Sequence, residues 1–298
     1  MDKVVTLVAG PRESLDDGLA DRIVAALFAE GAEVAVPDWL AAGRACDVAF
    51  SGIGDETAQA TVDLALDGRA VDGVVLPAAG RRKKLLIADM DSTIVVGETL
   101  DEIAALAGIG ERVAAITRRA MNGEIDFAGA LRERVGLLRG QPADLLDRVM
   151  ARLELMPGAK ALVATMRAHG AHTLLVSGGF TFFTDRVRNL VGFDHHEGNR
   201  LGIEDGRLTG TVGEPIQGRE HKLHMLETTA RAHGLDLAET LAVGDGANDL
   251  PMIRAAGLGV AYHAKPAVRA GARTRIGHAD LTALLYLQGY RQKEIVEG

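Results

Sequence analysis

Residues 85–93 read LLIADMDST: four apolar residues run directly into two aspartates, a serine and a threonine. Short apolar runs of this kind are typical of the buried strands of parallel sheets. Three further runs lie at residues 173–176, 241–243 and 259–261. Because they alternate with helix-like segments, we predict an α/β fold, a Rossmann-like parallel sheet wrapped by helices. Asp89 and Asp91 then lie at the carboxyl end of a strand, where open α/β sheets bind their ligands.

The first two apolar runs are separated by far more than the roughly one dozen residues that a crossover between parallel strands needs. Residues 99–153 in this gap are helix-like throughout, and Thr99 with Glu102 has the spacing of a capping box at the first helix. We therefore expect a helical cap insertion, at about residues 98–155, over the edge of the sheet.

Residues 1–79 follow a different pattern, with short apolar runs and helix-like segments in the order βαββαβ. This order suits a small α+β domain of the ferredoxin-like type. Small residues at 78–80 and a cationic run at 81–84 then break the pattern. We place the domain boundary here, with a second domain over residues 80–298, and interpret the cationic run as a solvated segment rather than a binding patch.

The chain has 298 residues and a formal net charge of -8, so it has no overall positive field to hold a nucleic-acid backbone. Cys46 is its one cysteine, which excludes an intramolecular disulfide and a cysteine metal cluster and fits a reducing cytoplasm. No apolar stretch approaches the roughly 20 residues that span a bilayer, and no secretory signal is visible. We therefore expect a soluble, cytoplasmic protein that binds neither nucleic acid nor membranes.

A second acidic segment follows the apolar run at 241–243. Residues 244–249 read GDGAND, so Asp245 and Asp249 come to the same edge of the sheet as the first aspartate pair. Carboxylates from two strand ends suit Mg²⁺, a hard cation that binds one or two carboxylates together with substrate phosphate. The alternative is structural, since aspartates after a strand also form turns, and Asn248 or Asp249 can cap the following helix.

Two further features complete the candidate site. Ser177-Gly178-Gly179 follows the run at 173–176, and its hydroxyl and glycine backbone N–H groups can hold a phosphate at the start of a helix. Lys222 lies near the start of a predicted helix that ends at about His233. Neither feature is specific alone: a single Ser-Gly-Gly is weak evidence, and a lysine on a helix is usually solvated.

Together the motifs occur in the order and spacing of the haloacid dehalogenase superfamily, which the chain resembles over residues 84–288. The motifs are Asp89–Thr93, Ser177–Gly179, Lys222 and Gly244–Asp249. More narrowly, residues 89–98, 120–138 and 243–266 are similar to the phosphoserine phosphatases of that superfamily. The N-terminal order resembles the ACT-like domains that accompany some of these enzymes and are associated with amino-acid binding or dimerisation.

The resemblance implies a magnesium-dependent phosphoric monoester hydrolase that works through an aspartyl-phosphate. Asp89 would be the nucleophile, and Asp91 would protonate the leaving oxygen and then activate water. Mg²⁺ would be held by Asp89, Asp245 and the backbone carbonyl of Asp91. The phosphoryl oxygens would be bound by Lys222, Ser177, Gly178 and Gly179. Asn248 and Asp249 would either contact the substrate or metal directly or orient the residues that do.

The predicted helix at 127–139 carries a candidate substrate arginine. One face of it, by the i, i+3, i+4, i+7 rule, holds Phe127, Ala130, Leu131, Arg134 and Leu138. A guanidinium on a buried face needs an anionic partner, either a substrate carboxylate or a structural ion pair with Glu102 or another acid of the cap. Periodicity leaves both open, and the resemblance assigns Arg134 to the substrate carboxylate. Arg132 and Arg139 point away from this face and read as solvated.

Glu98 precedes the predicted capping box and is free for another task, and the resemblance assigns it to the substrate ammonium. Glu98 and Arg134 would then recognise an amino acid together. The resemblance also places Met121 and Phe127 against the substrate as apolar contacts that exclude water. From the sequence alone, both read as ordinary core residues.

The expected reaction is hydrolysis of O-phospho-L-serine to L-serine and phosphate, the final step of serine biosynthesis. Two alternatives stay open. A phosphoserine:homoserine phosphotransferase would pass the phosphoryl group from Asp89 to homoserine instead of water. An amino-acid-binding regulatory protein would rely on the N-terminal domain, although the complete set of catalytic motifs argues against it. An ACT-like domain also allows a homodimer.

Overall fold

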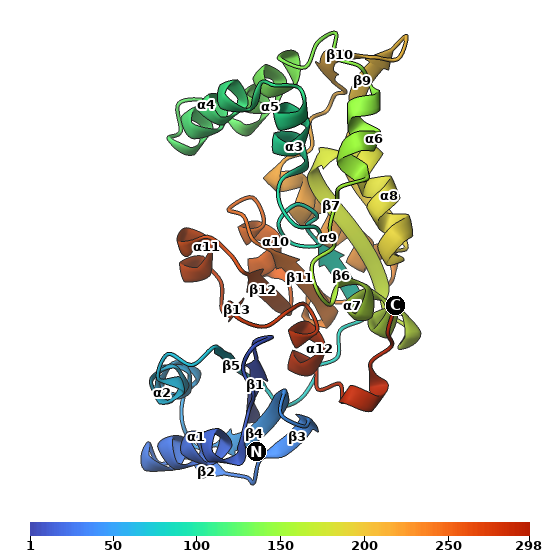
Figure 1. Ribbon diagram of the computed structural model, residues 1–298. Coiled ribbons are helices and arrows are strands. Elements are labelled where there is room, and N and C mark those ends of the chain that lie inside the picture. Colours follow the sequence, from blue (N-terminus) through green and yellow to red (C-terminus); the bar gives the residue numbers. More distant parts are fainter.

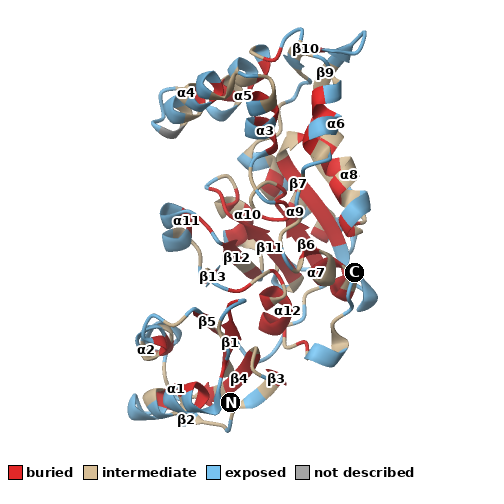
Figure 2. Cartoon of the chain, in the orientation of Figure 1, coloured by how far each residue is buried: buried red, intermediate tan, exposed pale blue. Residues whose placement is uncertain are grey.

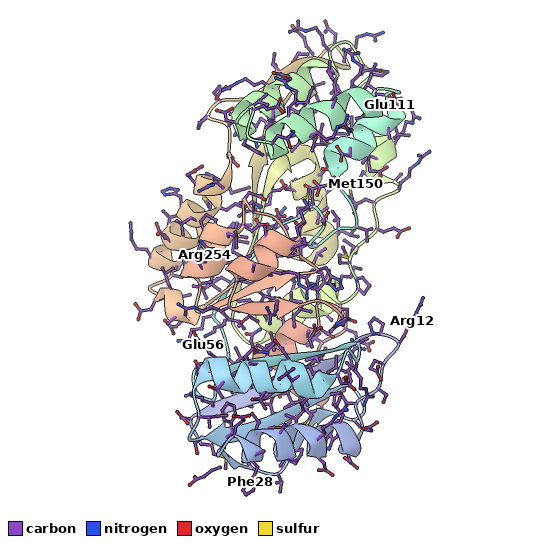
Figure 3. All side chains as sticks on the ribbon, turned by 90° about the vertical axis from the view of Figure 1, so that its left-hand side faces the viewer. Arg12, Phe28, Glu56, Glu111, Met150 and Arg254 are labelled. Carbon is purple, nitrogen blue, oxygen red and sulfur yellow. The ribbon has the colours of Figure 1, made fainter. Side chains whose placement is uncertain are left out.

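The computed structural model describes residues 1–298, apart from the side chain of Met121. A five-stranded N-terminal sheet lies at one end, a six-stranded sheet lies in the middle, and a group of helices forms a cap at the other end (Figure 1). Figure 3, turned by 90°, shows the same stacking of the three parts. None of the described helices combines the length and the apolar character that crossing a bilayer requires.

The central sheet has the strand order β13-β12-β11-β6-β7-β8, and every neighbouring pair is parallel. Its strands are β6 (Leu85–Ala88), β7 (His172–Phe180), β8 (His195–Asn199), β11 (Thr240–Gly244), β12 (Leu258–Tyr262) and β13 (Thr274–Ile276). All four predicted apolar runs are strands, which confirms the predicted α/β fold. β6 lies between β11 and β7, so the strands that carry the two acidic motifs and the Ser-Gly-Gly motif are neighbours, the last motif lying within the final residues of β7.

Helices surround this sheet, and its strands are largely buried (Figure 2). The helices are α7 (Ala159–Ala168), α8 (Thr181–Val191), α9 (Arg219–Ala232), α10 (Leu250–Ala255), α11 (Pro266–Gly271) and α12 (Ala283–Leu287), with short 3₁₀ helices at Leu237–Glu239 and Gln292–Glu294. Side chains of β6 alternate between two cores, with Leu86 and Ala88 in one and Leu85 and Ile87 in the other. Burial on both faces explains why this strand reads as a continuous apolar run.

The insertion between β6 and β7 contains the predicted cap helices. They are α3 (Thr99–Leu106), α4 (Gly110–Met121), α5 (Phe127–Gly136) and α6 (Asp144–Met150). The chain enters and leaves the cap through two paired segments: Val96 N–H donates to Glu154 O, and Met156 N–H donates to Ile94 O, both at 2.9 Å. A hairpin packs against α5 and consists of β9 (Leu201–Glu204) and β10 (Arg207–Val212).

The predicted capping box of Thr99 and Glu102 is wrong. α3 begins at Thr99 with Glu98 as the preceding cap residue, and no side chain caps it in the expected way. Thr99 N–H donates instead to Asp91 Oδ1 at 2.7 Å. The buried Thr99 hydroxyl has no hydrogen-bond partner among the described residues. The carboxylate of Asp91, which follows a strand, thus accepts the N–H that the capping-box pattern assigns to Glu102.

The N-terminal sheet is antiparallel, with the order β2-β4-β1-β5 and β3 paired to β4. Its elements are β1 (Lys3–Ala9), α1 (Asp17–Ala29), β2 (Glu33–Val34), β3 (Asp38–Ala41), β4 (Ala45–Ser51), α2 (Asp55–Leu66) and β5 (Val71–Pro77). The predicted βαββαβ order is present, with β3 as an additional short strand. Along β1, Val5 and Leu7 pack with α1 and α2, whereas Val8 joins the core of the central sheet. Both faces of the N-terminal sheet are therefore covered.

The cationic run at 81–84 ties this sheet to the rest of the chain. The expectation of a solvated segment is wrong for Arg81, whose side chain is 12% exposed. Arg81 donates to Asp47 Oδ2 in β4 at 2.5 Å and to the carbonyl of Tyr286 in α12 at 2.9 Å. The other cations are paired as well, Arg82 with Glu294, Lys83 with the carbonyls of Gly80 and Ala238, and Lys84 with Glu239. Apart from Gly80, these partners come from distant segments, which a local charge pattern does not show.

Candidate active site

The loop after β6 places two carboxylates at the carboxyl edge of the central sheet. Asp89 N–H continues the pairing with β11 by donating to Val243 O at 3.0 Å. Met90 is buried, and its carbonyl accepts the N–H of Ile94 at 2.9 Å, so the chain turns tightly here. Asp89 and Asp91, on either side of the buried methionine, both line the adjacent pocket.

This pocket has a volume of about 210 Å³ and is walled by the sheet edge and the cap. Its lining includes the predicted residues Asp89, Asp91, Glu98, Phe127, Arg134, Ser177, Gly178, Gly179, Asp245 and Asn248. It also includes residues that the sequence did not single out for the site, namely Thr99, Leu100, Leu131, Phe180, Gly246 and Lys265. Lys222 lies behind the wall, bonded to Asp89. The predicted contact of Met121 concerns a side chain outside the described part of the structure.

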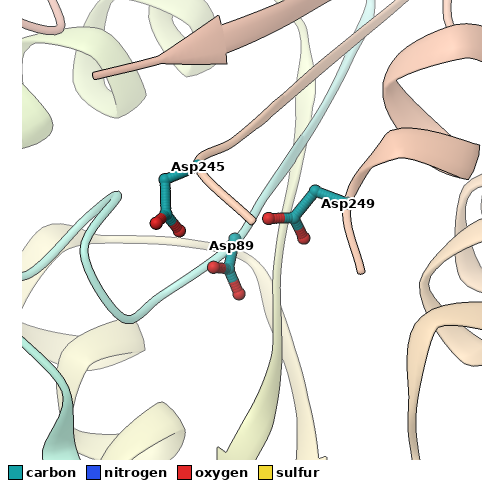
Figure 4. A group of neighbouring side chains, drawn as sticks. All are labelled: Asp89, Asp245 and Asp249. Atoms are coloured by element: carbon teal, nitrogen blue, oxygen red, sulfur yellow. The ribbon is translucent and has the colours of Figure 1, made fainter. Parts of the chain in front are cut away.

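Three aspartates lie close together (Figure 4), two of them, Asp89 and Asp245, in the wall of the pocket and Asp249 buried beside them. One carboxylate oxygen from each of Asp89, Asp245 and Asp249 lies within 4.8 Å of the others. Lys222 Nζ donates to Asp89 Oδ1 at 2.5 Å and to Asp249 Oδ1 at 2.6 Å. Lys222 is 1% exposed, which separates it from the usual solvated lysine on a helix. Three carboxylates against one buried ammonium leave an excess of negative charge, which a divalent cation would offset.

The charges in this group perturb one another strongly. Burial and the neighbouring charge of Asp249 raise the pKa of Asp89 well above its usual range, against the opposing effect of Lys222. Burial would lower the pKa of Lys222, but the carboxylates of Asp249 and Asp89 outweigh it and raise that pKa, so the ammonium stays charged. Burial also raises the pKa of Asp245. A bound cation would favour the ionised form of both raised acids.

The existing hydrogen bonds indicate which carboxylates could hold a cation. Both oxygens of Asp249 are occupied, Oδ1 by Lys222 and Oδ2 by the N–H of Gly246 at 2.9 Å. Asp89 has one oxygen without a donor among the described residues, and Asp245 accepts no hydrogen bond from a described side chain. Hard oxygen donors with free positions fit Mg²⁺, with Asp249 in an orienting role.

The carboxylate of Asp91 lies outside this group and faces a third strand end. Its Oδ1 accepts the N–H of Thr99 at 2.7 Å, and its Oδ2 accepts the Ser177 hydroxyl at 3.1 Å. Burial raises the pKa of Asp91, although these hydrogen bonds oppose the rise. A carboxyl group that accepts a proton more easily than usual is suited to general acid chemistry.

The Ser-Gly-Gly motif sits against the cap. Gly179 N–H donates to Ser177 Oγ at 2.8 Å. A side chain at Gly178 would meet the ring of Phe127 at 3.0 Å, and one at Gly179 would meet the Asp91 carboxylate at 3.1 Å. The two glycines thus allow the cap and the acid to approach the backbone closely, and keep that backbone open to a ligand.

Arg134 lines the part of the pocket formed by the cap. It makes one side-chain hydrogen bond, from Nε to Ala130 O at 3.3 Å, and no ion pair with any described residue. The structural alternative, a pair with Glu102, is therefore not formed. Burial lowers the pKa of Arg134, while the charges of Asp101 and Glu98 oppose the change. Most of its guanidinium donors are left for a ligand.

Glu98 also lines the pocket, and its Oε1 accepts the Ser92 hydroxyl at 3.0 Å. Burial of the carboxylate and the charge of Asp91 raise the pKa of Glu98 to about 7. Because the residue as a whole is exposed, water and salt screen part of this effect. The two arginines predicted to be solvated are exposed, Arg132 and Arg139.

Among the pocket residues that the sequence analysis did not name, Lys265 is the one whose place in the sequence best indicates a position in the site. It closely follows β12, a predicted strand, so it comes to the same sheet edge as Asp89 and Asp245. The sequence predicts Thr99 to be a helix cap, so Thr99 is not among the predicted site residues. The apolar wall gives no signal in the sequence, because pocket walls and cores have the same composition.

A sequence model of the haloacid dehalogenase-like hydrolase family matches residues 86–254. A phosphoserine phosphatase of Haemophilus influenzae is 47% identical over 203 residues, which cover 68% of this chain and 65% of that protein. A phosphoserine phosphatase of Streptococcus thermophilus is 46% identical over 199 residues, which cover 67% of this chain and 93% of that protein. The chain thus spans somewhat less than two thirds of some relatives, 65% for H. influenzae and 62% for Streptomyces coelicolor.

Two solved structures align with nearly the whole chain. A haloacid dehalogenase family hydrolase of Salmonella enterica serovar Typhi has a TM-score of 0.85 and 28% identity, covering 96% of this chain and 98% of that chain. A probable phosphoserine phosphatase of Vibrio cholerae has a TM-score of 0.80 and 32% identity, covering 98% and 88%. Coverage of this extent includes the N-terminal sheet, so its placement beside the central sheet is shared.

Proposed function

The chain belongs to the haloacid dehalogenase-like hydrolase family, and we propose that it is a magnesium-dependent phosphatase that hydrolyses O-phospho-L-serine to L-serine and phosphate, the final step of serine biosynthesis. One observation carries this proposal: the same pocket has a buried acidic group at its base and an arginine without an ion-pair partner among the described residues in its cap wall. Phosphoserine suits both parts, since it is a phosphate ester of a zwitterionic amino acid. The relatives from H. influenzae and S. thermophilus support the same substrate.

In the proposed reaction Asp89 attacks phosphorus in line and becomes an aspartyl-phosphate, while Asp91 gives its proton to the departing serine oxygen. Asp91 then takes a proton from the water that hydrolyses the aspartyl-phosphate. The raised pKa of Asp91 supports the first of these roles. Its contact with the N–H of Thr99 holds the acid at the junction of sheet and cap.

The remaining groups stabilise negative charge on the phosphoryl oxygens. Lys222 orients Asp89 and adds a fixed positive charge beside the reacting phosphorus. Mg²⁺, held by Asp89, Asp245 and the backbone carbonyl of Asp91, would supply charge that offsets the repulsion between nucleophile and phosphate. The other phosphoryl contacts are assigned to Ser177, Gly178, Gly179 and Asn248.

Selectivity for phosphoserine comes from the cap side of the pocket. Arg134 binds the α-carboxylate through two parallel N–H donors, and Glu98 accepts the ammonium. Phe127 lies close to Gly178 and Gly218 and is 38% exposed, and we assign it to the apolar contact that excludes water once substrate is bound.

We further propose an ACT-like domain over residues 1–79 and a phosphatase domain over residues 80–298, with the cap at about 98–155. The strand order β2-β4-β1-β5 with two helices supports a ferredoxin-like arrangement of the first part. A cytoplasmic location and a homodimer complete the proposal.

A phosphate-release assay with Mg²⁺ tests the proposed function. We expect turnover of phospho-L-serine to exceed that of phospho-D-serine, phosphothreonine and glycerol phosphate. Added homoserine should leave the release of free phosphate unchanged. Phosphate transfer to homoserine with little free phosphate would overturn hydrolysis in favour of the phosphotransferase, and no release from any phosphorylated amino acid would overturn the enzyme assignment.

A further inference from the structure

Lys265 is a cation in the pocket wall to which no role has yet been given. It lines the same pocket as Asp89 and Glu98, and its Nζ lies 4.0 Å from Asp245 Oδ2. Its side chain is 63% exposed, whereas Lys222 is buried and bonded to two carboxylates. Lys265 is therefore the lysine that can move and meet an incoming anion near the acidic group.

The backbone before Lys265 is held in an unusual conformation. His263 has a φ of 44°, in the left-handed region that residues other than glycine rarely adopt. Its N–H donates to Ile276 O at 2.8 Å, and its ring Nε2 lies 2.9 Å from Ala279 O, a distance that assigns the ring proton to Nε2. One contact with the end of β13 and one with the segment that follows it thus hold His263, two residues before Lys265.

That segment is held in turn by the N-terminal sheet. Asp72 in β5 accepts three backbone N–H groups, from Gly277 at 2.8 Å, His278 at 3.0 Å and Ala279 at 2.8 Å. Asp72 is 8% exposed, so water hardly competes for these charge-assisted bonds. The Asp72 carboxylate therefore holds the backbone of residues 277–279, which includes the carbonyl that the His263 ring contacts.

We propose that the Lys265 ammonium binds the phosphate group of the substrate as it enters the pocket, and that Asp72 positions Lys265 from the N-terminal sheet through residues 277–279 and His263. The N-terminal sheet then contributes to the active site although it lies at the opposite end of the molecule from the cap (Figures 1 and 3). This inference rests on the proposed function for the identity of the phosphate ester.

The first test replaces Lys265 by methionine and uses Lys293→Met, which removes another exposed lysine, as the matched control. For Lys265→Met we expect KM to rise on the order of ten-fold with little change in kcat, equally for phosphoserine and glycerol phosphate, because the contact is to phosphate. The dependence of kcat/KM on salt should also weaken. An unchanged KM, or a rise confined to phosphoserine, would overturn the phosphate contact.

A binding measurement separates this inference from the proposed function. Calorimetric titration of the Mg²⁺-loaded protein with inorganic phosphate should show weaker binding for Lys265→Met than for Lys293→Met. This result does not depend on which ester the enzyme hydrolyses. If phosphoserine is not a substrate but phosphate binding still falls in Lys265→Met, the proposed function fails and the Lys265 contact stands. Equal phosphate affinity in the two variants would contradict the contact.

The second test concerns the link to the N-terminal sheet. Asp72→Asn should raise KM as Lys265→Met does, and should add nothing further in the Lys265→Met background, because both changes act on one group. Asp63→Asn is the matched control, since Asp63 pairs with Arg275 across the same interface at 2.7 Å without contacting residues 277–279. It should leave KM unchanged. Additive effects of Asp72→Asn and Lys265→Met would refute the link.

A second variant, which leaves the interface with the N-terminal sheet intact, tests the same link in case Asp72→Asn does not fold. His263→Phe removes the ring donor to Ala279 but none of the Asp72 bonds. It should raise KM in the wild-type background and have no effect in the Lys265→Met background. If Asp72→Asn does not fold, the KM values of His263→Phe in the two backgrounds decide the question. A rise in KM that persists in the Lys265→Met background rejects the positioning role.

Discussion

Exchange of Lys222 for methionine tests how far the catalytic carboxylates depend on one buried cation. Lys222 Nζ lies 2.5 Å from Asp89 Oδ1 and 2.6 Å from Asp249 Oδ1. Asp89 is 5% exposed and Asp249 is 0% exposed. Removing one partner of a buried ion pair leaves charge without compensation and lowers the free energy of unfolding by about 3–5 kcal/mol. We expect a loss of this size in the metal-free protein at pH 8.

The loss should depend on pH in a defined direction. Lys222 opposes the rise in the pKa of Asp89, so in the variant that pKa rises further. A carboxyl whose folded-state pKa is raised stabilises the protein below its unfolded pKa, and this stabilisation disappears as the pH rises to the folded-state value. The deficit of Lys222→Met relative to wild type should therefore grow from pH 5 to pH 8.

Mg²⁺ should restore part of the stability but not the activity. The variant site carries one positive charge less, so a divalent cation binds it more tightly and stabilises the folded state by mass action. Phosphate release should fall by a factor of about 10² to 10³, because a positive charge beside the phosphoryl group is gone.

Urea unfolding at pH 5 and pH 8, with and without Mg²⁺, measures these effects, with the exposed Lys293→Met as control. An unfolding free energy of Lys222→Met within about 0.5 kcal/mol of wild type at pH 8 without metal would refute the reasoning.

Three further outcomes can be measured by phosphate release. Asp89→Asn should abolish turnover while the protein still unfolds cooperatively, and near-normal activity would sink the covalent mechanism. Arg134→Ala should raise KM for phosphoserine on the order of a hundred-fold and spare glycerol phosphate, because only phosphoserine has a carboxylate to lose; equal losses on both esters would argue against this contact. Glu98 has a pKa raised to about 7 and must be ionised to bind an ammonium, so KM for phosphoserine relative to glycerol phosphate should rise as the pH falls from 8 to 6. Glu98→Gln should remove this pH dependence, and a dependence that persists in the variant must come from another group.

Local patterns predicted much of the fold. The apolar runs around Leu86 and Val243 are strands, because a strand buried on both faces must be apolar along its whole length. The predicted capping box failed for the opposite reason. Thr99 had the right spacing to Glu102, but Asp91 was delivered to the same N–H by the fold, and a spacing rule does not register competitors from elsewhere in the chain.

The sequence by itself determined that Asp89, Asp245 and Ser177 share one edge of a sheet, because parallel strands end on the same side and hydrophobic periodicity locates those ends. Only the tertiary structure decided the state of the lysines. Lys222 is buried against Asp89, a partner 133 positions away that the fold brings to it. Lys265 lies in the pocket wall, two residues after His263, whose ring contacts Ala279, a residue bonded to Asp72 of the N-terminal sheet. Burial and ion pairing depend on which distant groups fold against a residue, and no local pattern contains that information.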